Sequence, residues 1–179
     1  WSKLLYGEQP AGWPIAGTKE SISKISRQDL ISYMQNQYTA KNTIVCLAGR
    51  IEPEEALTKA KAYFSKIKTK KPFLKPKVVE RQTRPELLLH QKKTDQTHFC
   101  LGVRSYNLFH KLRYAQEVLS VILGGMMSSR LFIEVREKLG LAYYISSSCE
   151  PDPDTGYLVT HAGVDNRKVQ EAISVILKE

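Results

Sequence analysis

The sequence is poor in cysteine and contains no long apolar run. Its three cysteines, Cys46, Cys100 and Cys149, are widely spaced and form no Cys-x-x-Cys pair. Such cysteines are typical of buried, reduced thiols, so we expect a reducing compartment and a cytoplasmic protein. No apolar stretch reaches the roughly 18 residues that span a bilayer, and no basic segment followed by an apolar one marks a signal peptide. We therefore expect no membrane span.

Charge of one sign dominates, because the net charge is +9 and the pI is about 9.4. Much of the excess lies in one short segment that also holds Pro72 and Pro76, namely in Lys66, Lys68, Lys70, Lys71, Lys75 and Lys77. No aromatic residues interleave with these lysines as stacking platforms for bases would. The pattern favours a solvated linker over a phosphate-binding groove, so we expect no nucleic-acid partner and keep that function as the least favoured alternative.

Helical and strand patterns divide the first part of the chain. Ser26 with Asp29 resembles a capping box and predicts a helix that starts there. The short apolar run in Asn42–Gly49 predicts a strand buried on both faces. Pro53 is suited to the first turn of the next helix, whose apolar stripe runs from Ala56 to Ile67.

A proline-rich and basic segment without apolar periodicity, residues 69–85, predicts an interdomain linker. It separates a first part, residues 1–68, from a second part, residues 86–179. The second part has the order β-β-α-α-β-β-α, with strands at 86–92, 97–106, 142–149 and 156–162, and helices at about 112–123, 129–139 and from about 166. Short connections favour antiparallel pairing, so we expect an α+β fold, a two-layer sandwich of helices on a mainly antiparallel sheet.

The most informative stretch is Gly124–Tyr143, with the sequence GGMMSSRLFIEVREKLGLAY. A glycine pair is followed by an amphipathic helix, a second glycine break at Gly140 and an aromatic strand. The glycine pair alone would be explained by one helix ending and the chain turning into the next.

This stretch resembles a signature of the insulinase/pitrilysin zinc metallopeptidases, also called inverzincins, and in particular their processing-peptidase-like members. The segment Trp13–Ile22, followed by Asp29 and Leu30, and the segment Asn42–Gly49 are similar to the same family in the same order. The resemblance implies two similar α+β domains that face each other across a chamber. The chain would then be an incomplete piece: the end of the catalytic-type domain (1–68), the linker (69–85) and the first half of the second, substrate-binding domain (86–179).

The family's inverted zinc motif, H-x-x-E-H, is absent. The histidines His90, His98, His110 and His161 are too far apart to lie one helical turn from each other. The resemblance therefore implies zinc in the intact parent, but no catalytic residue, no metal ligand and no activity in this chain by itself. For His98 we expect a half-buried strand histidine with a hydrogen-bond partner rather than a metal ligand.

The family places an arginine and a tyrosine of the second domain, seven residues apart, against the bound peptide. The same spacing carries these substrate-binding roles onto Arg136 and Tyr143. A plainer alternative is that Arg136 is a surface residue paired with a carboxylate. Because Tyr143 and Tyr144 are neighbours on a strand, one should face inward and the other outward, and either could belong to the core.

Two functions remain open. The favoured one is a piece of a zinc-dependent endopeptidase that contributes binding of a peptide or unfolded polypeptide, which would lie as an added strand along a sheet edge. The alternative is a piece of a non-catalytic family member that acts as a partner or scaffold subunit. Either form is compatible with a homo- or heterodimer. The residues that precede Trp1 in the intact protein would distinguish them, because the peptidase needs the zinc motif there.

Overall fold

The structure is a computed structural model that describes residues 1–179, and its contacts divide the chain into two compact units. The larger unit consists of Trp1–Gly12 together with Lys77–Glu179, and the smaller unit is Trp13–Pro76. The division at residue 76 falls inside the predicted linker, while residues 1–12 belong to the unit that holds the second part of the chain. The helices are too short or too polar to span a bilayer.

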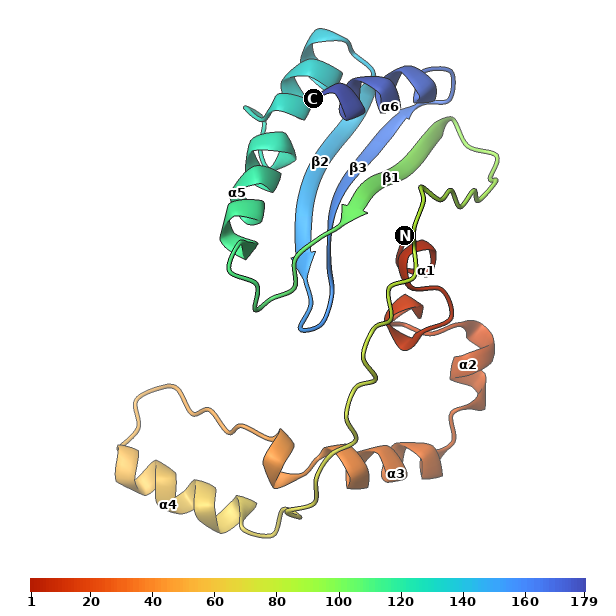
Figure 1. Ribbon diagram of the computed structural model, residues 1–179. Coiled ribbons are helices and arrows are strands. Elements are labelled where there is room, and N and C mark those ends of the chain that lie inside the picture. The colour runs from red at the N-terminus through yellow and green to blue at the C-terminus, as the bar shows by residue number, and fades with distance from the viewer. The chain divides into compact units, whose positions relative to one another are not determined.

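A three-stranded antiparallel sheet is the centre of the larger unit (Figure 1). Its strands are β1 (Gln96–Arg104), β2 (Ala142–Pro151) and β3 (Gly156–Asp165), in the spatial order β1-β3-β2. A short proline-containing turn joins β2 to β3, as the sequence predicts. The α+β fold class with an antiparallel sheet is confirmed.

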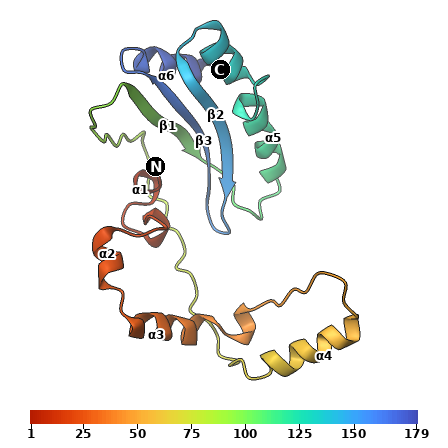
Figure 2. The same ribbon diagram turned by 180° about the vertical axis from the view of Figure 1, so that it is seen from behind.

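Helices cover one face of this sheet (Figures 1 and 2). They are α5 (Arg113–Gly124), the helix η3 (Phe132–Lys138) and α6 (Val169–Lys178). α5 and η3 pack on β2, and α6 contacts β3 and η3. The core lies between the two layers and consists of Leu131, Val135, Leu141, Ala142, Ile145, Ala162, Val164 and Ala172. Every second residue of the strands faces this core, which is why strands and helices form two layers.

The N-terminal segment packs on the opposite face of the sheet. It contains α1 (Ser2–Tyr6) and the short helix η1 (Pro10–Gly12). Trp1 lies so close to Gly102 that a β-carbon there would be 2.9 Å from its ring, and its ring meets that of Tyr157 edge to face at 5.6 Å. Val159, which is paired with Gly102, is only 1% exposed.

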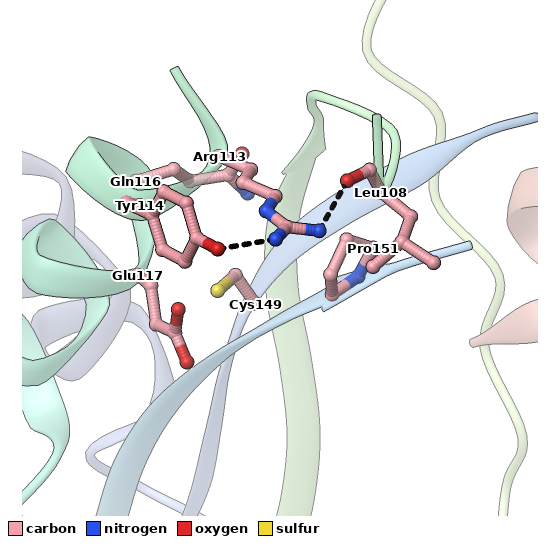
Figure 3. Close-up of a pocket in the computed structure, with 7 residues that line it drawn as sticks. All are labelled: Leu108, Arg113, Tyr114, Gln116, Glu117, Cys149 and Pro151. Carbon is pink, nitrogen blue, oxygen red and sulfur yellow. Dashed lines mark hydrogen bonds between the residues drawn. The ribbon is translucent and has the colours of Figure 1, made fainter. Parts of the chain in front are cut away.

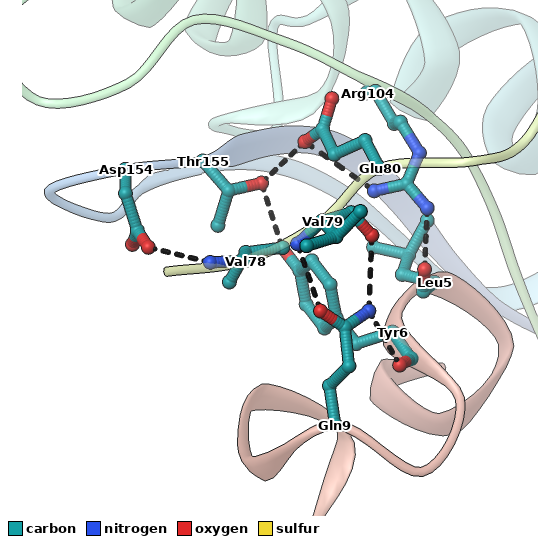
Figure 4. Close-up of polar contacts among 9 residues, drawn as sticks. All are labelled: Leu5, Tyr6, Gln9, Val78, Val79, Glu80, Arg104, Asp154 and Thr155. Atoms are coloured by element: carbon teal, nitrogen blue, oxygen red, sulfur yellow. Dashed lines mark hydrogen bonds and ion pairs between the residues drawn. The ribbon is translucent and has the colours of Figure 1, made fainter. Parts of the chain in front are cut away.

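Polar contacts join this segment to the sheet (Figure 4). The hydroxyl of Tyr6 lies 3.4 Å from that of Thr155, which donates a hydrogen bond of 2.6 Å to Glu80. The guanidinium of Arg104 donates to the carbonyl of Leu5 and pairs with Glu80 at 3.4 Å. These contacts tie three distant parts of the sequence together.

A backbone-like pairing adds to them. The side-chain amide of Gln9 accepts a hydrogen bond from the backbone N–H of Val79 at 2.8 Å and donates to its carbonyl at 3.0 Å (Figure 4). The backbone N–H of Val78 donates to Asp154 at 2.8 Å. These bonds fix the segment that follows Pro76 within the larger unit.

The smaller unit is helical. It contains α2 (Lys19–Lys24), α3 (Arg27–Gln37), the short helix η2 (Ala40–Asn42) and α4 (Pro53–Phe64). The predicted capping box is confirmed, because Ser26 accepts from the backbone N–H of Asp29 and Asp29 accepts from that of Ser26. Pro53 occupies the first turn of α4, as predicted.

Two predicted strands, 42–49 and 86–92, are wrong, because neither segment forms a ladder. Their apolar residues are exposed instead, with Ile44 at 96% and Leu89 at 80%. An apolar strand forms only where neighbouring strands satisfy its backbone and other side chains cover it, and nothing in the structure pairs with either segment.

The prediction of buried cysteines is also wrong for two of the three. All three cysteines are free, but Cys46 and Cys100 are exposed and Cys149 is half-buried. Cys46 is exposed for the same reason as its neighbours, because the strand predicted around it does not form. Cys100 lies on the helix-free face of β1.

Candidate functional site

The candidate site begins in η3, which is a π-helix over Phe132–Lys138 rather than the predicted α-helix over 129–139. The backbone N–H of Leu139 donates to the carbonyl of Glu134, five residues earlier, at 3.2 Å. π-helical turns are rare and frequently occur at functional sites. Within this helix Val135 is fully buried, while Leu139, at its end, is 45% exposed.

A glycine turn connects this helix to β2. Gly140 has a φ of +56°, the left-handed conformation that glycine adopts at helix ends. Its N–H donates to the carbonyl of Arg136 at 3.1 Å, and the N–H of Leu141 donates to that of Val135 at 2.8 Å. Because of these bonds, the helix ends directly at the start of the strand. Only a short connection therefore separates Arg136 from Tyr143.

Arg136 is exposed at the end of η3. Its guanidinium carbon lies 4.8 Å from the centre of the Phe132 ring, one π-helical turn earlier. No carboxylate pairs with it, although Lys138 in the same helix pairs with Glu134 and Arg130 pairs with Glu179. The plainer alternative, a surface arginine held in an ion pair, is therefore not what the structure shows. Its hydrogen-bond donors are available to a ligand.

Tyr143 lies at a β-bulge. Ala142 is opposite Val164 and Tyr144 is opposite Gly163, so that Tyr143 is the extra residue of β2. A bulge re-aims the side chains next to it. As a result Tyr143 is 56% exposed and Tyr144 is 42% exposed, and the expectation that one of them faces inward is wrong.

Two basic residues follow β3 closely. Arg167 donates hydrogen bonds to Asp165, and these bonds lower the pKa of that carboxyl group. The ammonium of Lys168 donates to the carbonyl of Gly140 at 3.2 Å. No hydrogen bond joins Arg136 to Tyr143, so the two side chains are not locked to each other. The arrangement offers donors to an acceptor-rich ligand such as a peptide backbone.

Further polar pairs lie on the helix-free face of the sheet. The Nδ1 atom of His98 is 3.1 Å from the hydroxyl of Tyr144, and the two rings stack at 5.8 Å. The expected hydrogen-bond partner of His98 is thus present, although His98 is exposed rather than half-buried. Cys100 Sγ is 3.2 Å from Nδ1 of His161. No sequence pattern marks this pair, because it depends on the register of β1 with β3.

A pocket of about 230 Å³ lies between the start of α5 and the end of β2 (Figure 3). Arg113 is its only cation, but it donates to the carbonyl of Leu108 at 2.6 Å and to the hydroxyl of Tyr114, and it stacks on that ring at 4.4 Å. These bonds use the guanidinium to hold the loop before α5. Arg113 is therefore not free to bind a ligand in this pocket.

The residues of this chain do not fit a zinc ion. No group of three or more histidine, cysteine, aspartate or glutamate side chains comes together in a way that could hold a metal. A catalytic zinc needs about three protein ligands. The two closest candidates, Cys100 and His161, form a pair without a third ligand.

Comparisons with known proteins identify a family. A family model described as "Peptidase M16 inactive domain" matches residues 24–179. An uncharacterized zinc protease of Bacillus subtilis is 33% identical over 175 residues, which are 98% of this chain and 42% of that protein. An uncharacterized zinc protease of Mycobacterium leprae is 33% identical over 175 residues, with 96% and 39% covered. The chain thus spans about two fifths of the length of these relatives.

Solved structures have the same fold. The structure of a peptidase M16 inactive domain from Pseudomonas fluorescens matches with a TM-score of 0.79 and 23% identity, over 99% of this chain and 45% of that one. A protease from Helicobacter pylori matches with a TM-score of 0.77 and 22% identity, over 94% and 43%. A chain of complex III2 from Candida albicans matches with a TM-score of 0.73 and 16% identity, over 93% and 41%.

Proposed function

The chain belongs to the peptidase M16 inactive-domain family, which is the insulinase family that the sequence resembles, and we propose that it contributes peptide binding to a longer zinc endopeptidase. The single observation that carries the proposal is the unpaired, exposed guanidinium of Arg136 beside a bulge that exposes Tyr143. The zinc and its ligands belong to the part of the longer protein outside this chain.

The chemistry of the two side chains is suited to an extended peptide. A guanidinium and a phenol both donate hydrogen bonds, and the carbonyl oxygens of a peptide backbone accept them. The ring of Phe132 packs against the guanidinium of Arg136 and restricts its conformations, so the arginine side chain loses less conformational freedom on binding. Binding through backbone carbonyls would hold many sequences, as a peptidase acting on unfolded polypeptides requires.

The test uses the intact protein and a quenched peptide substrate. Arg136→Ala and Tyr143→Phe each remove one hydrogen bond to the substrate. A charge-assisted bond contributes about 1.5–3 kcal/mol, so the loss from Arg136→Ala should slow turnover roughly ten- to a hundred-fold. Zinc content and melting temperature should stay unchanged. Arg130→Ala is the matched control, because this exposed arginine of the same region is paired with Glu179.

A purely structural role would give the opposite pattern. The variants would then lower the melting temperature, and the folded fraction would keep its specific activity. Loss of activity in Arg130→Ala equal to that in Arg136→Ala would also contradict the proposal, because it would show a general effect of positive charge.

The second candidate is a partner or scaffold subunit without catalytic zinc. One structural neighbour, a chain of complex III2, is part of a multi-subunit assembly, which favours this candidate as an alternative. A dimer with a second family member is compatible with both functions. An H-x-x-E-H motif in the intact protein, with metal-dependent hydrolysis, would select the peptidase, and its absence would select the partner subunit.

A further inference from the structure

The helix-free face of the sheet carries a thiol and an imidazole in direct contact. Cys100 of β1 lies opposite His161 of β3, and its Sγ is 3.2 Å from Nδ1 of the imidazole. The N–H of Ser105 donates to the carbonyl of Gly156 in the same register, so Cys100 and His161 form a pair of the kind without backbone hydrogen bonds between its members. Side chains lie closest in such pairs, which is why the thiol and the imidazole meet.

The imidazole of His161 has no other role in the structure. The thiol of Cys100 is its only hydrogen-bond partner. His98 lies on the same face but differs, because its Nδ1 is 3.1 Å from the hydroxyl of Tyr144. In the tautomer that carries its proton on Nε2, Nδ1 of His161 accepts the S–H of Cys100. His161 is therefore placed to take the proton of the thiol.

The thiol is accessible to a reagent. Cys100 is free and exposed. On the other side of His161 the paired residue of β2 is Ser146, which is small and exposed, so it leaves the pair open. Cys46 is also free and exposed, but it makes no contact with an imidazole. The chain thus contains one exposed thiol with a neighbouring base and one without.

The environment of Cys100 favours one kind of thiol chemistry. Burial raises the pKa of this thiol, so it is protonated at neutral pH and reacts only when a base removes the proton. A thiolate of high pKa is the stronger nucleophile once it has formed. Oxidation by peroxide instead favours thiols of low pKa. A metal ion would need a third ligand, which is absent.

We propose that Cys100 is a site of reversible modification by a low-molecular-weight disulfide, with His161 as the base. Nδ1 of His161 takes the proton of the thiol while Sγ attacks one sulfur of the disulfide. A new S–S bond forms between Sγ and that sulfur, and the S–S bond of the reagent breaks. The departing thiolate takes the proton from His161. The disulfide is the oxidant, and the products are a mixed disulfide at Cys100 and one free thiol.

The mixed disulfide should persist until an external thiol reverses the reaction. Cys149 is on the helix side of the sheet, where Oγ of Ser120 lies 3.8 Å from its Sγ. Cys46 belongs to the smaller unit. No second cysteine therefore lies on the face of Cys100 to displace the adduct. The inference goes beyond the proposed function, because it does not involve Arg136 or Tyr143.

The test treats the 179-residue chain with oxidised glutathione and follows each cysteine by peptide mapping and mass spectrometry. Cys100 should be modified faster than Cys46 by roughly tenfold or more, because only Cys100 has a base beside it. In concentrated urea the two cysteines should react at the same rate, since unfolding separates Cys100 from His161. An excess of dithiothreitol should restore the original mass.

Two variants separate the base from the other histidine of this face. His161→Gln keeps a polar side chain of similar size but removes the base, so the rate at Cys100 should fall to about that of Cys46. His98→Gln is the matched control and should leave the rate at Cys100 unchanged. The rate at Cys46 should stay the same in both variants, and their melting temperatures show whether they fold. The comparison of Cys100 with Cys46 in the unaltered chain does not depend on either variant.

Three results would overturn the inference. One is a rate at Cys100 no higher than that at Cys46 in the folded chain. The second is an equal loss of rate at Cys100 in His98→Gln and in folded His161→Gln. The third is a product at Cys100 that dithiothreitol does not remove. The proposed function is tested separately, because Arg136→Ala should leave the rate at Cys100 unchanged.

Discussion

Tyr6 should contribute more to the stability of the larger unit than any exposed tyrosine, although it lies far from the sheet in sequence. Its ring is 4% exposed, and Arg104 lies over it at 5.6 Å. Removal of a buried aromatic side chain typically costs about 3–5 kcal/mol, so Tyr6→Ala should lower the free energy of unfolding by that amount. This is a large share of the roughly 5–15 kcal/mol that stabilises a domain.

Tyr6→Phe separates the ring from the hydroxyl. The hydroxyl is 3.4 Å from that of Thr155, and Thr155 keeps its hydrogen bond of 2.6 Å to Glu80 when the phenol is removed. The cost should therefore be at most about 1 kcal/mol. Tyr143→Ala is the control in the same unit, because Tyr143 is 56% exposed, and a change at the surface should stay within about 0.5 kcal/mol.

The assay is urea unfolding followed by the fluorescence of Trp1 in a Trp13→Phe background, so that the signal reports the larger unit alone. The pH dependence adds a second readout. Burial raises the pKa of Tyr6 above its ordinary value of 10.0, so its neutral form is stabilised in the folded state. Stability from this group is present below pH 10 and is lost as the pH rises further. Equal effects of Tyr6→Ala and Tyr143→Ala would refute the packing of the N-terminal segment on the sheet.

The remaining predictions concern the linker, a helix cap and the isolated chain. Brief trypsin treatment should cut the predicted linker first, at the lysines from Lys66 to Lys77, because residues 78–80 are held by hydrogen bonds and an ion pair. First cleavage at Arg130 or Arg136 would show that the boundary is misplaced. Ser26→Ala should lower the helicity of α3 and lower its stability by about 0.5–2 kcal/mol, as measured by thermal unfolding. Hydrogen bonds from Ser26 lower the pKa of Asp29 below its ordinary value of 3.8, so this cap is intact above pH 3.8 and is lost as the pH falls further. An unchanged acid transition in Asp29→Asn would contradict this. The chain alone should not hydrolyse a quenched peptide with or without added zinc, and metal-dependent hydrolysis with stoichiometric zinc would overturn the assignment.

Local signals explain the parts of the fold that the sequence predicts well. The capping box at Ser26, the proline that starts α4 and the turn between β2 and β3 each depend on a few adjacent residues. Val135, in the core, belongs to the helix that the amphipathic pattern predicts. The fold class follows from the order of such elements.

Non-local contacts explain the parts that it does not. The π-helical geometry of η3 and the bulge at Tyr143 arise where a helix end is tied to a strand start, and no pattern of residue types marks them. The packing of Trp1 over Gly102 depends on residues 101 positions apart in the sequence. The strands expected at 42–49 and 86–92 have good strand composition but no neighbouring strand to pair with. For the site, the resemblance to the family implied Arg136 and Tyr143 through their seven-residue spacing, and the structure adds that both are exposed and unpaired.

The most direct test of the account is whether Arg136 touches a bound peptide. Side-chain NMR of the arginine Nε–H groups can be followed while an unstructured substrate peptide is added to the 179-residue chain. If Arg136 contacts the peptide, its signal should shift and saturate, and the shift should be much smaller in Tyr143→Phe. The signals of Arg130 and Arg113 should stay in place, because Glu179 holds Arg130 and the carbonyl of Leu108 holds Arg113. A shift confined to Arg104 beside the open edge of β1, or equal shifts of all arginines, would contradict it.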